Sequence, residues 1–342
     1  MQPNYQKSVQ MLKPNPVKLF IFIAAMFVWV FGGKRVSAQD PLFSQFYANP
    51  LYLNPALAGA EGCGRLVFNY RNQPFPAFGT FSTYSVSADQ YFSSVSGGLG
   101  ILAMHDNQGG LLNTTQVGVV YAYQTQLTRT WYANFGIQAN YINHYLNWDE
   151  LIFADQFNPA GPALPAQELP PGQLSDHLPD LAAGVVIYNG RFYGGLAAHH
   201  LNQAGSSLFP DEKLPLKLTL HLGYEFSAKP ARTSHATQEG VSFSPNLIIQ
   251  SQSDYYRINY GFYTHLNPLV AGIWFRHGVK HPNSLIFLLG IKQVNYAIGY
   301  SYDHSLSGFS ATGRGAHEIG VLLNFNCAAP NMKYRILNCP SF

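Results

Sequence analysis

Long stretches of strict two-residue alternation restrict the fold of this chain more than any other feature. In residues 214–228, apolar side chains occupy every even position from Leu216 to Phe226, whereas Lys217 and His221 lie at odd positions. Successive side chains of a β-strand point to opposite faces, so the pattern predicts a strand with one apolar and one polar face. Such a strand is long for a globular protein, where about 5–6 residues is usual, but suits a tilted strand that crosses a bilayer.

The composition decides between the two folds that such strands could build. Charged residues make up only 11% of the chain and aromatic residues 15%. A secreted β-sandwich can also alternate, but here the polar faces are rich in Gly, Asn, Gln and Ser, and the apolar faces carry aromatic residues near their ends. This favours a polar lumen and an outer apolar band with an aromatic girdle. We therefore expect an all-β, antiparallel outer-membrane β-barrel in the lipid membrane.

Fourteen segments fit this pattern, and an even number is what a bacterial barrel of this kind requires. They lie near 65–73, 80–92, 96–106, 113–127, 130–146, 181–189, 191–202, 214–228, 241–253, 255–267, 268–278, 283–294, 295–306 and 315–327. Odd-numbered connections include the long ones, 147–180, 203–213 and 305–314, with exceptions at 229–240 and 251–254. Because outer-membrane barrels have short periplasmic turns, we expect both termini in the periplasm.

The first 38 residues have the order of a secretory signal peptide. Three lysines precede an apolar run at 19–33, and the small residues Ser37 and Ala38 follow. The run is too short to cross a bilayer as a helix. The first 38 residues hold five cations and no acid, so the remainder has a net charge of −2 and lacks the basic surface of a nucleic-acid-binding protein.

Residues 39–64 do not alternate, yet they are too apolar for a solvated tail. Prolines at 41, 50 and 55 exclude one regular helix across the stretch. Three places could bury it: the barrel lumen, the periplasmic rim or a partner protein. We assign this plug or docking role to Pro41, Phe43, Gln45, Tyr47, Tyr52, Asn54 and Pro55. The expected domains are a signal peptide at 1–38, the plug or docking segment at 39–64, the barrel at 65–327 and a periplasmic tail at 328–342.

The opening DPLFSQFYANPLYLNPALAGAEG resembles that of the PorP/SprF-like family of type IX secretion system membrane proteins of the Bacteroidetes. The resemblance continues through YRNQ at 70–73, the pair His200-Leu201, GYSYD at 299–303 and GAHEI at 315–319. It ends with NCPSF at 338–342. It implies an outer-membrane barrel that acts in protein secretion or in delivery of gliding-motility adhesins.

The partners that the resemblance implies are secreted proteins with C-terminal sorting domains, and other secretion subunits of the outer-membrane translocon or the periplasmic ring. A 14-stranded lumen is too narrow for folded cargo, so we expect the barrel to bind or dock cargo or translocon subunits. The alternative is a passive porin-like transporter of small or hydrophobic solutes.

No catalytic or metal-binding motif stands out, and we expect neither an enzyme nor a cofactor. The chain contains no HExxH, no Cys-x-x-Cys and no GxSxG element. His199 and His200 are adjacent, so on a strand we expect them to point to opposite faces.

The three cysteines are Cys63, Cys327 and Cys339, an odd number for an oxidising compartment. Cys63 precedes the first expected strand and Cys327 ends the last, and these strands are neighbours in a closed barrel. We predict one disulfide, either Cys63–Cys327 across the seam or Cys327–Cys339 in the tail. Non-reducing mass spectrometry of protein from native membranes tests this prediction, and three free thiols would contradict it.

Overall fold

The computed structural model describes residues 40–75, 79–151, 153, 156, 170, 172–208, 212–227, 241–278, 283–306 and 315–326. The signal peptide expected at 1–38 and the tail expected at 328–342 lie outside these residues. No helix within the described ranges is long and apolar enough to cross a membrane.

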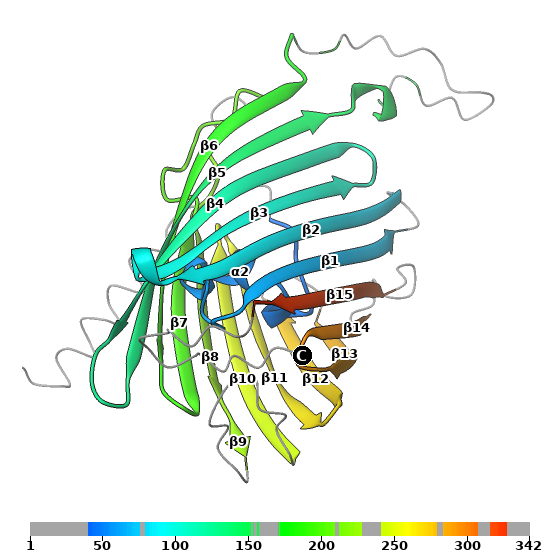
Figure 1. Ribbon diagram of the computed structural model, residues 1–342. Coiled ribbons are helices and arrows are strands. Elements are labelled where there is room, and N and C mark those ends of the chain that lie inside the picture. Colours follow the sequence, from blue (N-terminus) through cyan, green and yellow to red (C-terminus); the bar gives the residue numbers. More distant parts are fainter. Residues whose placement is uncertain are drawn as a thin grey trace, which may run out of the picture. The chain divides into compact units, whose positions relative to one another are not determined.

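The described strands form one antiparallel sheet that closes on itself (Figure 1). In chain order they are β1 (Gly64–Phe75), β2 (Gly79–Phe92), β3 (Gly97–Gln108), β4 (Leu112–Gln126), β5 (Tyr132–Leu146), β6 (Ser175–Tyr188), β7 (Phe192–His199), β8 (Lys217–Tyr224), β9 (Phe226–Ser227), β10 (Val241–Gln252), β11 (Tyr255–Leu266), β12 (Leu269–Gly278), β13 (Ser284–Lys292), β14 (Tyr296–Ser305) and β15 (Ala316–Phe325). Strands that follow one another along the chain pair with each other, and β15 pairs with β1 to close the barrel.

The barrel has fourteen strands, because β8 and β9 are two parts of one strand. Both pair with β10, and only Glu225 separates them. The predicted number and the antiparallel barrel architecture are therefore confirmed.

One predicted boundary is wrong: β6 begins at Ser175, whereas the alternation predicts a start near 181. Pro179 lies inside this extra part and argues against a strand when only the sequence is read. The strand tolerates it because pairing with β7 begins only at Ala183. The carbonyl of Pro179 accepts a hydrogen bond from the Asn202 side chain on that side, where no ladder bond is lost.

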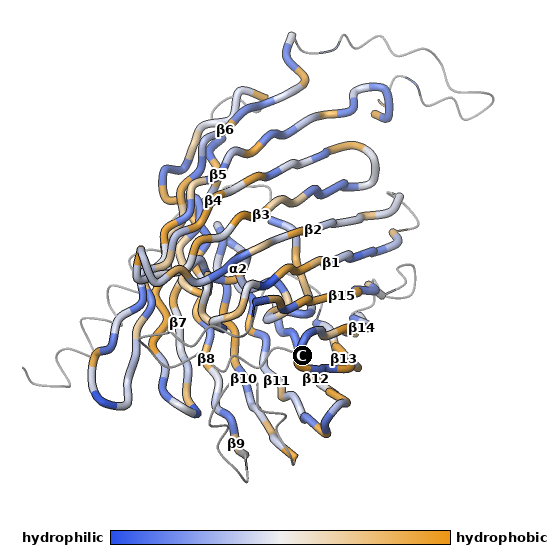
Figure 2. Tube along the Cα trace, viewed as in Figure 1, coloured by the Kyte–Doolittle hydropathy of each residue, from blue (hydrophilic) through white to orange (hydrophobic). Residues whose placement is uncertain are grey.

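Charge is sorted completely between the two faces of the barrel wall. Twelve charged residues lie in the strands, and all occupy inward positions: Arg65, Arg71, Asp89, Asp106, Asp176, Asp180, Lys217, Arg257, Arg276, Lys292, Asp303 and Glu318. Eleven of them are buried, and Lys292 is half-buried at the end of β13. The outward positions expose large apolar side chains such as Ile137 and Leu289, whose exposed fractions are 63% and 67%. The tube in Figure 2 shows the resulting change of hydropathy along the strands.

The two ends of the barrel differ in their connections. Long connections at 147–174, 200–216 and 306–315 lie at one end, which we call the long-loop end. The opposite turn end holds short connections such as 189–191 and 267–268. Two connections depart from this rule, as the sequence predicts: 228–240 is long although it lies at the turn end, and 253–254 is short although it lies at the long-loop end. The chain enters β1 and leaves β15 at the turn end.

Candidate functional site

Residues 40–63, which we call the N-terminal segment, lie inside the barrel. They contain η1 (Phe46–Ala48), α2 (Pro50–Leu53) and η2 (Pro55–Leu57); α2 lies among the strands in Figure 1. A proline takes the first position of both α2 and η2, where its missing N–H costs no helical hydrogen bond. Asn54 caps η2, since its side chain accepts a hydrogen bond from the Ala56 amide. Of the three places that the sequence left open, the structure supports the lumen.

Aromatic side chains of the segment pack against aromatic residues of the barrel wall. Phe46 contacts Trp274 of β12 with ring centroids 5.0 Å apart. Tyr47 meets Tyr193 of β7 at 5.7 Å and Tyr263 of β11 at 6.5 Å. All five side chains are almost completely buried. Full burial of such a side chain contributes about 1.5–3 kcal/mol, so these contacts explain why inward positions of these strands carry aromatic residues.

Glu318 of β15 binds the backbone of the segment directly. Its carboxylate accepts hydrogen bonds from the backbone amides of Ser44, at 2.6 Å, and Gln45, at 3.0 Å. The Gln45 side chain donates back to the backbone carbonyl of Glu318 at 2.9 Å. Asp303 of the neighbouring strand β14 accepts a bond from the Ser44 hydroxyl at 3.0 Å. Two carboxylates thus hold one short stretch of the segment.

Two arginines neutralise these carboxylates. Arg71 of β1 lies 3.3 Å from Asp303 and 3.4 Å from Glu318, and Arg276 of β12 lies 2.5 Å from Asp303. Arg71 also donates to the Ser44 hydroxyl at 2.6 Å. We call Arg71, Arg276, Asp303 and Glu318 the charge cluster. Removal of one partner from a buried ion pair costs about 3–5 kcal/mol because the other charge stays buried.

The middle of the segment is held by asparagines and by close backbone approach. Asn49 donates to Ser85 of β2 at 2.9 Å, and Asn54 donates to the carbonyls of Val185 and Leu196 at 3.2 and 3.3 Å. At Gly136 of β5 a Cβ atom would collide with the backbone of Ala56. Glycine is therefore required where η2 contacts the wall.

Near the turn end, Arg65 and Asp89 form a bidentate ion pair with distances of 2.9 and 3.0 Å. Asp89 also accepts from the Gly59 amide at 2.7 Å, and Arg65 donates to the Leu57 carbonyl at 3.1 Å. This pair fixes the last part of the segment before it enters β1.

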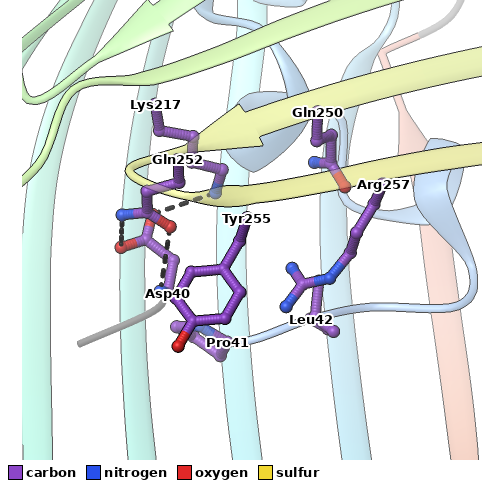
Figure 3. A pocket seen from close by; sticks show the side chains of 8 residues that line it. All are labelled: Asp40, Pro41, Leu42, Lys217, Gln250, Gln252, Tyr255 and Arg257. Atoms are coloured by element: carbon purple, nitrogen blue, oxygen red, sulfur yellow. Dashed lines mark hydrogen bonds and ion pairs between the residues drawn. The ribbon is translucent and has the colours of Figure 1, made fainter. Parts of the chain in front are cut away.

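The start of the described segment binds at the long-loop end (Figure 3). The Asp40 carboxylate lies 2.9 Å from Lys217 and 3.1 Å from His200, and it accepts from Gln252 at 3.0 Å. Lys217 also contacts the Tyr52 hydroxyl at 3.0 Å. A cavity of about 10 Å³ adjoins these residues and has room for about one water molecule. It is lined by Asp40, Pro41, Leu42, Lys217, Gln250, Gln252, Tyr255 and Arg257.

Opposite charges stabilise the ionised forms of two groups outside the strands. Burial alone would raise the pKa of Asp40, but Lys217 and His200 hold it well below its usual value. Burial likewise would lower the pKa of His200, but Asp40 and Asp180 raise it to about 10. Both groups are therefore charged at neutral pH, and their pairing holds the start of the segment.

All seven residues assigned from the sequence lie in the segment, where some contact the wall and others contact the segment itself. Phe43 packs on Tyr52 at 5.3 Å, the Pro41 carbonyl accepts from the Tyr52 hydroxyl, and Pro55 begins η2. Gln45, Tyr47 and Asn54 bind the wall as described. Whether these residues also bind a partner protein stays a prediction.

Reading the sequence missed Asp40 and Ser44 as well as every residue of the wall that binds the segment. A signal was present: each internal motif that carries the family resemblance supplies one such residue. YRNQ supplies Arg71, the His-Leu pair supplies His200, GYSYD supplies Asp303 and GAHEI supplies Glu318.

The expectation that His199 and His200 point to opposite faces is wrong, since both are buried. β7 ends at His199, and the left-handed backbone of His200, with φ 60°, turns its side chain inward.

Cys63 is buried and disulfide-bonded. Cys327 and Cys339 lie outside the described residues, so the pairing stays a prediction. Within the described part of the chain, no three metal-binding side chains cluster.

The family described as "Type IX secretion system membrane protein PorP/SprF" matches residues 35–323. No curated protein matches the chain.

Solved barrels have a similar fold. The toluene transporter TbuX of Ralstonia pickettii has a TM-score of 0.50 and 11% identity, covering 80% of this chain and 93% of its own. The toluene transporter TodX of P. putida has a TM-score of 0.46 and 9% identity, with coverage of 80% and 92%. Omp33 of Acinetobacter baumannii has a TM-score of 0.43 and 7% identity, with coverage of 78% and 100%. At such identities the likeness to TbuX concerns the fold alone.

The Glu318→Gln variant is expected to loosen the N-terminal segment. The substitution keeps the shape but removes the charge that pairs with Arg71 and binds two amides. We expect the amides of Ser44 and Gln45 to exchange hydrogen at least about a hundredfold faster, as a loss of about 3 kcal/mol implies. Hydrogen exchange with mass spectrometry measures this.

Asp106→Asn is the matched control, since Asp106 accepts hydrogen bonds from Thr83 and Gln108 and none from the segment. Equal protection in both variants would contradict the prediction.

The contact between Asp40 and His200 is expected to depend on pH at both extremes. The pKa of Asp40 is depressed, so its contribution is present above about pH 4 and is lost as the pH falls. The pKa of His200 is raised, so its contribution is full below about pH 6.5 and is lost as the pH rises through about 10.

Hydrogen exchange of the amides of residues 40–48, corrected for the intrinsic exchange rate at each pH, tests the expectation across this range. His200→Gln should abolish part of the alkaline change, whereas His265→Gln, a change in the lumen at the turn end, should preserve it. An alkaline change identical in all three proteins would show that His200 does not hold the segment.

Proposed function

The chain belongs to the PorP/SprF family of type IX secretion system membrane proteins, and from this premise we propose that it acts as a closed docking barrel in the outer membrane. In this proposal it binds secreted proteins with C-terminal sorting domains, or subunits of the translocon and the periplasmic ring, at its rims and loops. Cargo does not pass through its lumen.

The observation that carries this proposal is the occupied lumen. The N-terminal segment contacts the wall from the long-loop end, at Asp40, to the turn end, at Gly59. Its buried aromatic residues and the charge cluster fill the space between opposite strands. A 14-stranded lumen is in addition too narrow for folded cargo.

The balance of charge supports the same proposal. The twelve charged strand residues comprise six cations and six carboxylates, and the segment adds Asp40 to the pair of Lys217 and His200. An ion-selective pore instead lines its passage with unbalanced charge. Balanced charge in a lumen that the N-terminal segment occupies suits a rigid support better than a channel.

For orientation, we propose that the turn end faces the periplasm, since short turns lie there in outer-membrane barrels. The long-loop end, with the connections 147–174 and 200–216, then faces outward. The chain enters and leaves the barrel wall on the periplasmic side, where ring components are accessible, while Asp40 lies toward the outside. The side on which the chain terminates stays a prediction.

Two measurements on the same tagged protein test the docking role. A pull-down in mild detergent from native membranes, with mass spectrometry, should recover sorting-domain proteins or secretion subunits that an unrelated outer-membrane barrel does not recover. In planar bilayers the purified protein should show no steady conductance. Steady conductance or solute uptake by the barrel alone, without co-purifying secretion proteins, would favour the transporter. Loss of secretion in a deletion strain without any cargo bound would instead favour structural anchoring.

A further inference from the structure

The charges in the connections between strands differ in sign at the two ends of the barrel. The connections at the turn end hold four cations and one carboxylate, whereas those at the long-loop end hold three cations and seven carboxylates. The turn-end residues are Arg129, Arg191, Lys229, Arg232 and Glu239, and the long-loop residues are Lys213, Lys280, Arg314, Asp149, Glu150, Asp155, Glu168, Asp211, Glu212 and Asp254. These side chains are charged at neutral pH, so the turn-end connections are basic and the long-loop connections acidic.

Two of the turn-end cations belong to the described residues, and both are exposed. Arg129 lies in the connection between β4 and β5, and Arg191 lies in the turn between β6 and β7. Within the described ranges neither guanidinium forms an ion pair or a side-chain hydrogen bond, whereas Arg71 and Arg276 of the wall both pair with carboxylates.

The other described charges at this end belong to the lumen. Glu61 lies 3.1 Å from Arg65, which also pairs with Asp89. Lys292 points inward from the end of β13, and Glu225 continues the lumen-facing positions of β8. The amide of Glu225 donates to the carbonyl of Arg191 at 2.9 Å, but no ion pair joins their side chains in the described structure. The outer rim therefore presents two arginines without a described carboxylate partner.

Short hydrogen-bonded turns hold both arginines. The Leu127 amide donates to the Trp131 carbonyl at 2.9 Å, and the Thr128 hydroxyl accepts from the Trp131 amide at 3.2 Å. In the other turn the Asn189 side chain accepts from the amides of Arg191 and Phe192, both at 2.8 Å. A surface that is ordered before it binds loses less entropy on binding.

The two turns lie side by side. The rings of Trp131 and Phe192 meet edge to face with centroids 5.8 Å apart. Leu127 is exposed next to them although it is apolar. We call Leu127, Arg129, Trp131, Arg191 and Phe192 the turn-end patch. Aromatic residues and arginine are enriched in the cores and hot spots of protein interfaces.

The tip of the β4–β5 hairpin extends beyond the lipid. Tyr123 is the last outward aromatic residue of β4 and marks the end of the apolar band. Leu127 follows about 13 Å further along the strand, which a tilt of about 40° reduces to about 10 Å along the membrane normal. The headgroup layer on one side is about 5–8 Å thick. Arg129 therefore reaches the water, where a protein is a better partner than a lipid headgroup.

We propose that the turn-end patch is a docking site for an acidic surface of a partner protein, whose carboxylates bind Arg129 and Arg191. The inference deepens the docking role proposed above and rests on it; in the proposed orientation this partner lies in the periplasm. A guanidinium binds a carboxylate through two parallel hydrogen bonds, and Leu127 and Trp131 add apolar contact area. The acidic long-loop end repels the same partner, so the partner binds one end of the barrel.

Binding of fluorescein-labelled poly-L-glutamate, the probe for an acidic protein surface, tests the proposal. The full mature protein is placed in phosphatidylcholine nanodiscs, whose lipid has no net charge, and fluorescence anisotropy gives the dissociation constant. The Arg129→Glu/Arg191→Glu variant should bind at least about tenfold more weakly, because two attractions become two repulsions. Added salt should weaken binding to the unchanged protein.

Lys213→Glu is the matched control, since it reverses an exposed cation at the long-loop end and should leave the affinity unchanged. Arg129→Gln and Arg191→Gln, each expected to lose part of the affinity, serve if the double variant does not fold. No binding to the unchanged protein, or equal affinity in the double variant, would overturn the proposal. Retention of phosphatidic acid in mixed nanodiscs in place of poly-L-glutamate binding would also overturn it, since the arginines would then bind headgroups.

A pull-down of the tagged protein from native membranes separates this proposal from the docking role itself. The double variant should recover fewer periplasmic secretion subunits than the unchanged protein, whereas Lys213→Glu should recover as many. Equal recovery by the double variant would overturn the proposal for the turn-end patch and leave the docking role intact. Recovery of no secretion protein by the unchanged protein would overturn both.

Discussion

The structure depends on one constraint: the wall of a membrane barrel is a single layer, so each strand side chain faces either lipid or the lumen. Charge is expensive in hydrocarbon, by about 2–4 kcal/mol for a cation at the midplane. All twelve charged strand residues consequently face inward. An interior with six cations and six carboxylates then needs partners for each, because an unpaired buried charge is more costly than a lost hydrogen bond.

The N-terminal segment meets this need. Its backbone amides at Ser44 and Gln45 bind Glu318, the amide of Gly59 binds Asp89, and the carboxylate of Asp40 binds Lys217. The segment thus supplies polar groups where the wall alone leaves charges without enough partners, and its apolar side chains fill the space between them. Wall and segment form one polar network with an aromatic interior.

Much of the wall was predictable because a two-residue period has a direct physical cause. Leu218 and His221 fall on opposite sides of any strand, whatever else the chain does. The one wrong boundary, the start of β6, lies where local chemistry overrides the period. Pro179 has no N–H to donate, but β7 does not pair with β6 at this point, so no ladder hydrogen bond is lost. The predicted direction of the His200 side chain was wrong for a similar reason. Its backbone is left-handed, and in a residue other than glycine this conformation is set by the surroundings.

The lumenal site was less predictable, because periodicity assigns a face and not a partner. Ser44 and Glu318 are 274 residues apart in the chain, and no local pattern relates them. Only closure of the barrel, which brings β15 beside β1, places Glu318 and Arg71 on the same patch of wall. The assigned residues Gln45, Tyr47 and Asn54 were found because an apolar, proline-interrupted stretch must be buried somewhere. Their wall partners follow from strand order and register. The same geometry fixes the segment in place. Its withdrawal would leave both the charge cluster and the Arg65–Asp89 pair without the hydrogen bonds that the segment supplies, so the segment is an integral part of the barrel.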